Sequence, residues 1–134
     1  LEVQSNRSVI DFAARHVYTP TFRLGKWVIP QGYSLSVALG QVHNNAEEFP
    51  DPKRFDPARF IGDRPSVFAW IPFGGGTRRC VGAAFANMEM DVVLRTVLRH
   101  FTIETTTAPG EKWHSRGVAF TPKRGGRITV RRRD

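Results

Sequence analysis

The sequence predicts an α+β fold with one long helix and several short strands. The helix is predicted over residues 81–100, where apolar residues recur every three or four positions and form a broad stripe. Residues 33–39 alternate between apolar and polar side chains, a pattern typical of a strand. Between these segments, the prolines of residues 42–60 exclude a regular helix or a central strand. Because phenylalanines recur in this segment, we expect an ordered coil and not a linker.

The remaining elements are predicted from local patterns. Residues 1–7 are too few to assign by periodicity. The apolar run at residues 9–14 is expected to be a connector packed inside the protein. Residues 21–29 predict a hairpin that turns at the Leu24–Gly25 pair. After the long helix, strands are expected at residues 101–104, 116–121 and 127–131.

The length and the charge of the chain limit the kinds of protein and of partner that need to be considered. The chain has 134 residues, which is enough for one ordinary domain core. Its formal net charge is +8, from 20 Lys and Arg against 12 Asp and Glu. The basic residues scatter and are not interleaved with aromatic residues, so we expect no nucleic-acid partner. No apolar run is long enough to span a membrane, so we expect no membrane segment in this chain.

The chain begins at Leu1 and not at methionine, so it is expected to be a piece of a longer protein. A single cysteine excludes an intramolecular disulfide and suits a reducing compartment.

That cysteine, Cys80, lies in the sequence PFGGGTRRCVG at residues 72–82, just before the predicted helix. The N-terminus of a helix carries partial positive charge and unpaired N–H groups, and both favour a thiolate, the form that binds metals. The glycines let the backbone turn tightly beside a flat ligand. A lone cysteine is more often a small buried hydrophobic residue, so the residues around it decide between these interpretations.

Those residues fit the pattern F-x-x-G-x-R-x-C-x-G at every fixed position, with Phe73, Gly76, Arg78, Cys80 and Gly82. The segment closely resembles the haem-ligand signature of the cytochrome P-450 family. The resemblance implies haem b (iron protoporphyrin IX) as the cofactor, with Cys80 as the axial thiolate ligand of the iron and the other four residues around it. The arginine is expected to pair with a haem propionate, and the phenylalanine to shield the sulfur.

The resemblance also implies the fold. Residues 1–134 are expected to be a C-terminal fragment of one cytochrome P-450 domain, with the distal half absent. The family order in this part is a small sheet, a proline-rich meander, the cysteine loop, one long helix and terminal β hairpins. This order agrees with the elements predicted above.

The resemblance also bears on four further positions, Glu2, Ser5, Arg15 and Arg59, while His43 is interpreted from its polar surroundings in the sequence. Relatives carry a Glu-x-x-Arg motif whose residues bond to the arginine of an F-x-P-x-R-F segment. Here Glu2 and Arg59 fit, but Ser5 stands at the motif's arginine position. We therefore expect a Glu2–Arg59 pair without its third member, and a looser coil. Arg15 matches by position an arginine that binds a propionate, although an exposed surface charge is an equal alternative. His43 is expected to be solvated and to have no role.

For the family, the implied activity is insertion of one oxygen atom from O2 into a small organic substrate. A ferredoxin or a flavoprotein reductase would supply the electrons. No catalytic residue is assigned in this chain. A cytoplasmic location is expected if the protein is a soluble member of the bacterial type.

Two hypotheses from different classes stay open. In the first, the chain is part of a haem-thiolate monooxygenase. In the second, it is a truncated, non-catalytic remnant or a haem-binding fragment without monooxygenase activity of its own. Ser5 and the missing distal half favour the second for the isolated chain, which is expected to be inactive.

Overall fold

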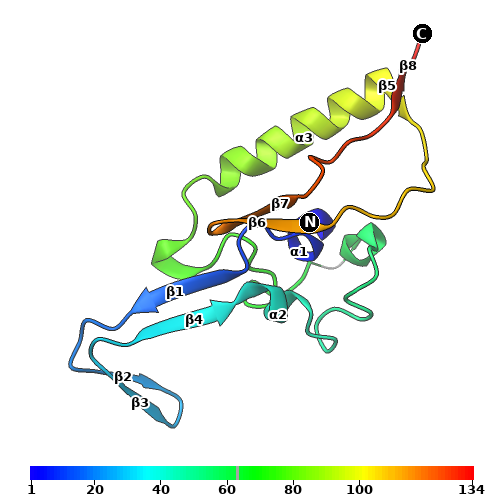
Figure 1. Cartoon of the computed structure of the whole chain (residues 1–134). Coiled ribbons are helices and arrows are strands. Elements are labelled where there is room, and N and C mark those ends of the chain that lie inside the picture. Colours follow the sequence, from blue (N-terminus) through cyan, green and yellow to red (C-terminus); the bar gives the residue numbers. More distant parts are fainter. Residues whose placement is uncertain (63) are drawn as a thin grey trace. The chain divides into compact units, whose positions relative to one another are not determined.

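The computed structural model describes residues 1–62 and 64–134. The chain forms two compact units, Leu1–Gly74 and Gly75–Asp134. Figure 1 shows their helices and strands. The structure contains several short strands and one long helix, so the α+β fold class is confirmed.

The first unit begins with α1 (Glu2–Asn6) and contains two antiparallel strand pairs. β1 (Phe12–His16) pairs with β4 (Ser34–Ala38), with Phe12 opposite Ala38 and His16 opposite Ser34. β2 (Thr21–Leu24) and β3 (Trp27–Pro30) form the predicted hairpin. Gly25 lies in its turn at φ +56°, where glycine avoids the strain that a side chain would add.

The interpretation of residues 9–14 as a packed connector is wrong. Much of this run belongs to strand β1, whose backbone groups pair with β4. Phe12 is 46% exposed and Val9 is 60% exposed. Apolar composition indicated burial, but the backbone conformation here is set by the pairing of N–H and C=O groups with a strand that lies far along the sequence.

The predicted coil follows the short helix α2 (Leu39–His43), which the sequence analysis did not predict. One 3-10 turn, η1 (Pro57–Phe60), interrupts the coil. Its first residue is Pro57, whose missing N–H is harmless at a helix start. The Asp56 side chain accepts a hydrogen bond from the Ala58 N–H at 3.0 Å and caps the turn.

The core of the first unit gathers around Phe49, which is 4% exposed. Its ring contacts the ring of Phe60 at a centroid distance of 6.3 Å. Val17, Leu39 and Ala69 are the other buried apolar residues among those described in this unit. Phe49 and Phe60 therefore anchor the coil as predicted, whereas Phe55, the third of its recurring phenylalanines, is 55% exposed.

The second unit contains the long helix α3 (Ala83–His100), so the prediction of a helix over residues 81–100 is confirmed to within two residues. The turn η2 (Gly76–Arg78) precedes it. β5 (Phe101–Ile103) follows directly and pairs with β8 (Val130–Arg132), while β6 (Trp113–Arg116) pairs with β7 (Ala119–Pro122).

The predicted single strand at residues 116–121 is wrong. Arg116 ends β6, and Ala119 begins β7 on the other side of a tight turn. Gly117 occupies this turn at φ +66°, which a strand does not allow. The apolar residues that follow Gly117 indicated a strand, but the glycine itself marks the turn.

Among the residues that the structure describes, no helix combines the length and the apolar character needed to cross a membrane.

The conformation of Gly117 in the β6–β7 turn can be tested by its effect on the stability of the chain. Gly117→Ala should lower the free energy of unfolding by about 1–2 kcal/mol, because alanine at this φ is strained. The control is Gly110→Ala, where the φ is ordinary and an added Cβ also meets nothing within 4 Å. That control should change the free energy of unfolding by less than about 0.5 kcal/mol in urea denaturation. Equal effects of the two variants would contradict the turn geometry.

Candidate functional site

The cysteine loop is shaped by two glycines with positive φ. Gly74 has φ +69° and closes the first unit, and Gly76 has φ +66° and begins η2 in the second unit. An added Cβ at either position would meet no atom within 4 Å. Glycine is therefore not required here by a lack of space. It is favoured by the backbone conformation, which residues with a side chain rarely adopt.

Cys80 lies between η2 and α3, and its thiol is free and exposed. Its carbonyl oxygen accepts a hydrogen bond from the Ala83 N–H at 3.3 Å, which leads the chain into α3. The N-cap of α3 is Gly82, which has no side chain to cap the helix, and the first turn carries no acidic residue. No side chain of these residues therefore neutralises the partial positive charge at the N-terminus of α3, so this charge can stabilise an anion beside it.

A haem iron ligand needs an accessible sulfur with room around it, and the described residues fit this need. The Cys80 thiol is exposed, and a Cβ placed on Gly82 would lie 3.7 Å from its Sγ. Arg78 is exposed on the same turn and is a suitable partner for a carboxylate of the cofactor. No cluster of three or more His, Cys, Asp or Glu side chains suited to a metal ion occurs in residues 1–62 and 64–134. A single thiolate on haem iron needs no such cluster.

Gly76, Arg78, Cys80 and Gly82 lie in the second unit, along the segment that runs from η2 to the N-cap of α3. The other two predicted site residues belong to the first unit. Phe73 is partly buried. Arg15 lies exposed on β1 and donates from Nη1 to the carbonyl oxygen of Ala14 at 2.8 Å. Its pairing with a propionate stays a prediction.

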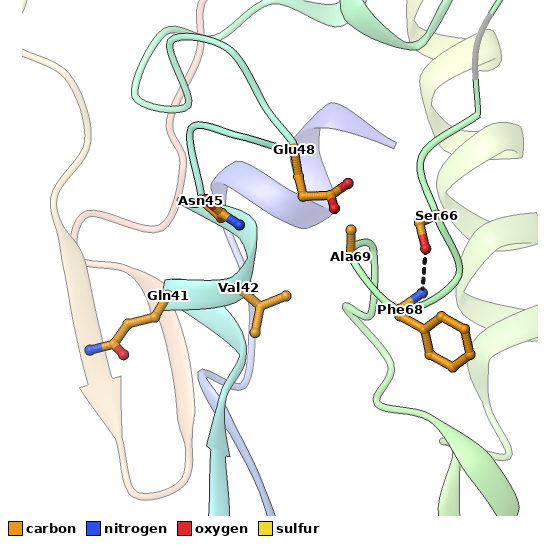
Figure 2. Close-up of a pocket in the computed structure, with 7 residues that line it drawn as sticks. All are labelled: Gln41, Val42, Asn45, Glu48, Ser66, Phe68 and Ala69. Atoms are coloured by element: carbon orange, nitrogen blue, oxygen red, sulfur yellow. Dashed lines mark hydrogen bonds between the residues drawn. The ribbon is translucent and has the colours of Figure 1, made fainter. Parts of the chain in front are cut away.

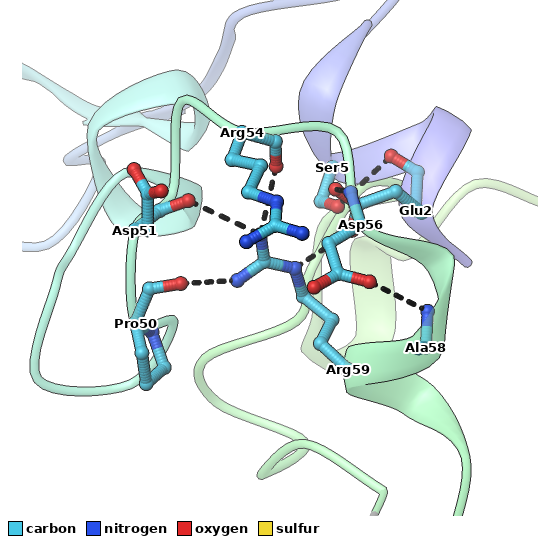
Figure 3. Close-up of polar contacts among 8 residues, drawn as sticks. All are labelled: Glu2, Ser5, Pro50, Asp51, Arg54, Asp56, Ala58 and Arg59. Atoms are coloured by element: carbon cyan, nitrogen blue, oxygen red, sulfur yellow. Dashed lines mark hydrogen bonds and ion pairs between the residues drawn. The ribbon is translucent and has the colours of Figure 1, made fainter.

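The first unit contains a buried ion pair between α1 and η1 (Figure 3). Arg59 Nε lies 3.2 Å from Glu2 Oε2, and their side chains are 13% and 5% exposed. The other carboxylate oxygen, Glu2 Oε1, accepts a hydrogen bond from the Asp56 N–H at 2.9 Å. The predicted Glu2–Arg59 pair is therefore present, with Ser5 turned to its own helix, where its Oγ donates to the Glu2 carbonyl oxygen at 3.2 Å.

Arg59 also binds the main chain of the coil, as Figure 3 shows. Its guanidinium donates to three carbonyl oxygens, those of Pro50, Asp51 and Arg54. Carbonyls in a coil have no ladder partner, so a guanidinium with several donors can satisfy them. Arg59 thus holds the coil through these carbonyls as well as through Glu2, and the looser coil expected from Ser5 stays a prediction.

The expectation of a solvated, idle His43 is wrong. His43 is 3% exposed, and its Nε2 accepts a hydrogen bond from the Ile71 N–H at 3.0 Å. Its ring meets the Phe49 ring nearly at right angles, at 6.4 Å between centroids. Burial lowers the pKa of His43, and the negative charge of Asp11 partly opposes this. The sequence did carry a signal, since Leu39 and His43 are four residues apart and share one face of α2.

A pocket of about 530 Å³ also lies in the first unit (Figure 2). Its wall is made of both polar and apolar residues, and the Phe68 N–H donates to Ser66 Oγ at 3.2 Å at one side. No residue of the cysteine loop lines it. The lining residues are Gln41, Val42, Asn45, Glu48, Ser66, Phe68 and Ala69.

Comparison with known proteins decides the family. The sequence profile of Cytochrome P450 matches residues 2–128. The chain belongs to the cytochrome P450 family. A curated relative from Mycobacterium tuberculosis, designated cytochrome P450 138, is 71% identical over 133 residues, which are 99% of this chain and 30% of that protein. Another from the same organism, designated cytochrome P450 135B1, is 46% identical over 86% of this chain and 24% of that protein.

Solved structures agree with this family. A cyanobacterial CYP120A1 with bound retinoic acid matches 98% of this chain and 31% of its own, with a TM-score of 0.83 and 26% identity. A zebrafish cytochrome P450 with abiraterone matches 99% of this chain and 32% of its own, with a TM-score of 0.82 and 27% identity. The predicted cytochrome P450 fold is thus confirmed, and the chain spans about 30% of the length of the first of its curated relatives.

Cytochrome P450 proteins are haem-thiolate proteins of the monooxygenase class, and their cofactor is haem b. The predicted cofactor class is therefore confirmed at the level of the family.

The contribution of the buried Glu2–Arg59 ion pair to stability can also be tested. Arg59→Met should lower the free energy of unfolding by about 3–5 kcal/mol, because it leaves the Glu2 carboxylate buried and unpaired. The matched control is Asp91→Asn, which removes the exposed Asp91–Arg95 pair and should have no measurable effect in urea denaturation. A small loss in Arg59→Met would show that the ion pair does not hold α1 to the coil.

Proposed function

We propose that Cys80 is the axial thiolate ligand of haem iron, and that this chain forms the iron-binding part of a haem-thiolate monooxygenase. The observation that carries the proposal is the exposed, free Cys80 thiol directly before the uncapped N-terminus of α3, within a complete five-residue family signature. When bound, haem would supply the activation of dioxygen for insertion of one oxygen atom into an organic substrate.

The chain's own residues would act on the sulfur and on the carboxylates of the cofactor. The positive end of α3 would stabilise Cys80 as a thiolate and moderate its basicity. The N–H groups of residues 81 and 82 would serve as donors toward the sulfur, as ligand-orienting groups do in other metal sites, since the Ala83 N–H donates to the Cys80 carbonyl oxygen. Arg78, and Arg15 if it comes within reach, would pair with propionates. Phe73 would exclude water from the sulfur.

The wider role is also a proposal. Because the chain spans 30% of the relative that it matches at 71% identity, we assign residues 1–134 to one C-terminal part of a single P450 domain. The substrate would be a small organic molecule, and the donor a ferredoxin or a flavoprotein reductase. The net charge of +8 suits an acidic donor. A reducing, cytoplasmic setting would keep the single cysteine as a thiol.

Ser5 is the observation that favours the alternative, a non-catalytic remnant or haem-binding fragment. A second arginine at that position would bring a further cation to Glu2. The bonding of Arg59 to Glu2 and to three carbonyls weakens this alternative, since the coil is held without that arginine.

The ligand assignment is tested by spectroscopy of the haem-loaded chain. The ferrous carbon-monoxide complex of the wild type should show a thiolate-type Soret band, and Cys80→Ser should lose it. The serine variant keeps the size of the side chain and removes the soft, anionic donor. A thiolate-type band that persists in Cys80→Ser would refute the assignment, because the chain has one cysteine.

Arg78 and Arg79 offer a matched pair for the propionate assignment, since both are exposed and adjacent. Arg78→Gln should weaken haem binding by about tenfold, equivalent to about 1.4 kcal/mol, through loss of a charge-assisted hydrogen bond. Arg79→Gln should weaken it by less than about twofold. Haem titration followed by absorbance gives both dissociation constants. A larger loss in Arg79→Gln would move the propionate contact to that residue.

A further inference from the structure

We infer that His43 is a positioning residue for the segment that leads into the cysteine loop, and that protonation of its imidazole releases this segment. The ring binds the main chain at Ile71, which directly precedes the segment 72–82. Nothing in the family signature includes this histidine. The hydrogen bond between the Ile71 N–H and His43 does not depend on haem. The consequence of its loss for the haem ligand rests on the function proposed above.

The hydrogen bond fixes the protonation state of His43. Its Nε2 accepts the Ile71 N–H at 3.0 Å, so Nε2 carries no proton. The neutral ring must then carry its proton on Nδ1. Within residues 1–62 and 64–134, Nδ1 is buried without a hydrogen-bond partner. A proton added to the ring would turn Nε2 into a donor that points at another donor, so the bond to Ile71 would be lost.

The surroundings disfavour the charged ring. His43 is 3% exposed and packs against the edge of Phe49. Burial lowers its pKa, and Asp11 is the charged group that acts against this. Each of the other charged groups on the neighbouring elements is either paired or exposed. Glu2 of α1 pairs with Arg59. The exposed groups are Arg15 and His16 of β1 and Glu47 and Glu48 of the coil.

The sign of the pH effect follows from this lowered pKa. The folded chain binds the proton more weakly than the unfolded chain, whose imidazole has the ordinary pKa of 6.5. The stability that neutral His43 provides is therefore fully present above pH 6.5. It is lost as the pH falls from that value through the lowered pKa of the folded state.

Trp70 provides a local probe, because it precedes Ile71 and its Nε1 atom is buried. Trp27→Phe and Trp113→Phe leave it as the single tryptophan. Its fluorescence should shift to the red as the pH falls from above 6.5 through the lowered pKa of His43 in the folded chain. His43→Gln, whose side-chain oxygen can accept from the Ile71 N–H but does not titrate, should abolish this shift. His114→Gln removes an exposed histidine and should leave the shift unchanged.

A red shift that persists in His43→Gln, or no shift in the parent, would overturn the inference. A measurement on the unsubstituted chain guards against a variant that does not fold. The nitrogen-15 chemical shifts of the His43 ring should report a proton on Nδ1 at neutral pH and a pKa below 6.5. A proton on Nε2, or an ordinary or raised pKa, would equally overturn the inference.

Spectroscopy of the haem-loaded chain distinguishes a failure of this inference from a failure of the proposed function. In acid, the wild type should lose the thiolate-type band of the ferrous carbon-monoxide complex, and His43→Gln should retain it. Equal loss in both proteins would contradict a role of His43 in haem ligation. If the band is missing at every pH while the Trp70 shift behaves as expected, Cys80 ligation fails and the role of His43 at Ile71 stands.

Discussion

Arg59 joins two parts of the first unit that lie far apart in the sequence. Its ion pair with Glu2 ties η1 to α1, and its three bonds to carbonyl oxygens tie η1 to the preceding coil. The coil cannot build a helix or a ladder of its own, because its prolines remove donors. One guanidinium with several donors replaces that missing regular structure. Without it, several main-chain acceptors and one buried carboxylate would lose their partner at once.

His43 is the counterpart of Arg59 at the other end of the same coil. Arg59 holds main-chain acceptors and His43 holds a main-chain donor, the Ile71 N–H. A guanidinium has only donors to offer, whereas an imidazole can lose its function as an acceptor in acid. The coil is therefore held by the guanidinium of Arg59, and the segment that leads to the cysteine loop is held by the imidazole of His43.

Much of this structure could be predicted from the sequence. The apolar stripe of α3 and the Leu24–Gly25 turn predicted their elements because the signals are local. The Glu2–Arg59 pair was found through the family resemblance and is present. The strand β1 was missed because its partner β4 lies far along the chain, and apolar residues alone do not reveal strand pairing. The burial of His43 was missed because its helix α2 is short and its partner Ile71 is distant in sequence.

The central claim is that the Cys80 sulfur binds haem iron, and X-ray absorption at the iron K-edge of the haem-loaded chain tests it most directly. The account predicts one sulfur scatterer in the first shell of iron, alongside the porphyrin nitrogens, that disappears in Cys80→Ser. A first shell that contains only nitrogen or oxygen in the wild type, or a sulfur that remains in Cys80→Ser, would contradict the account.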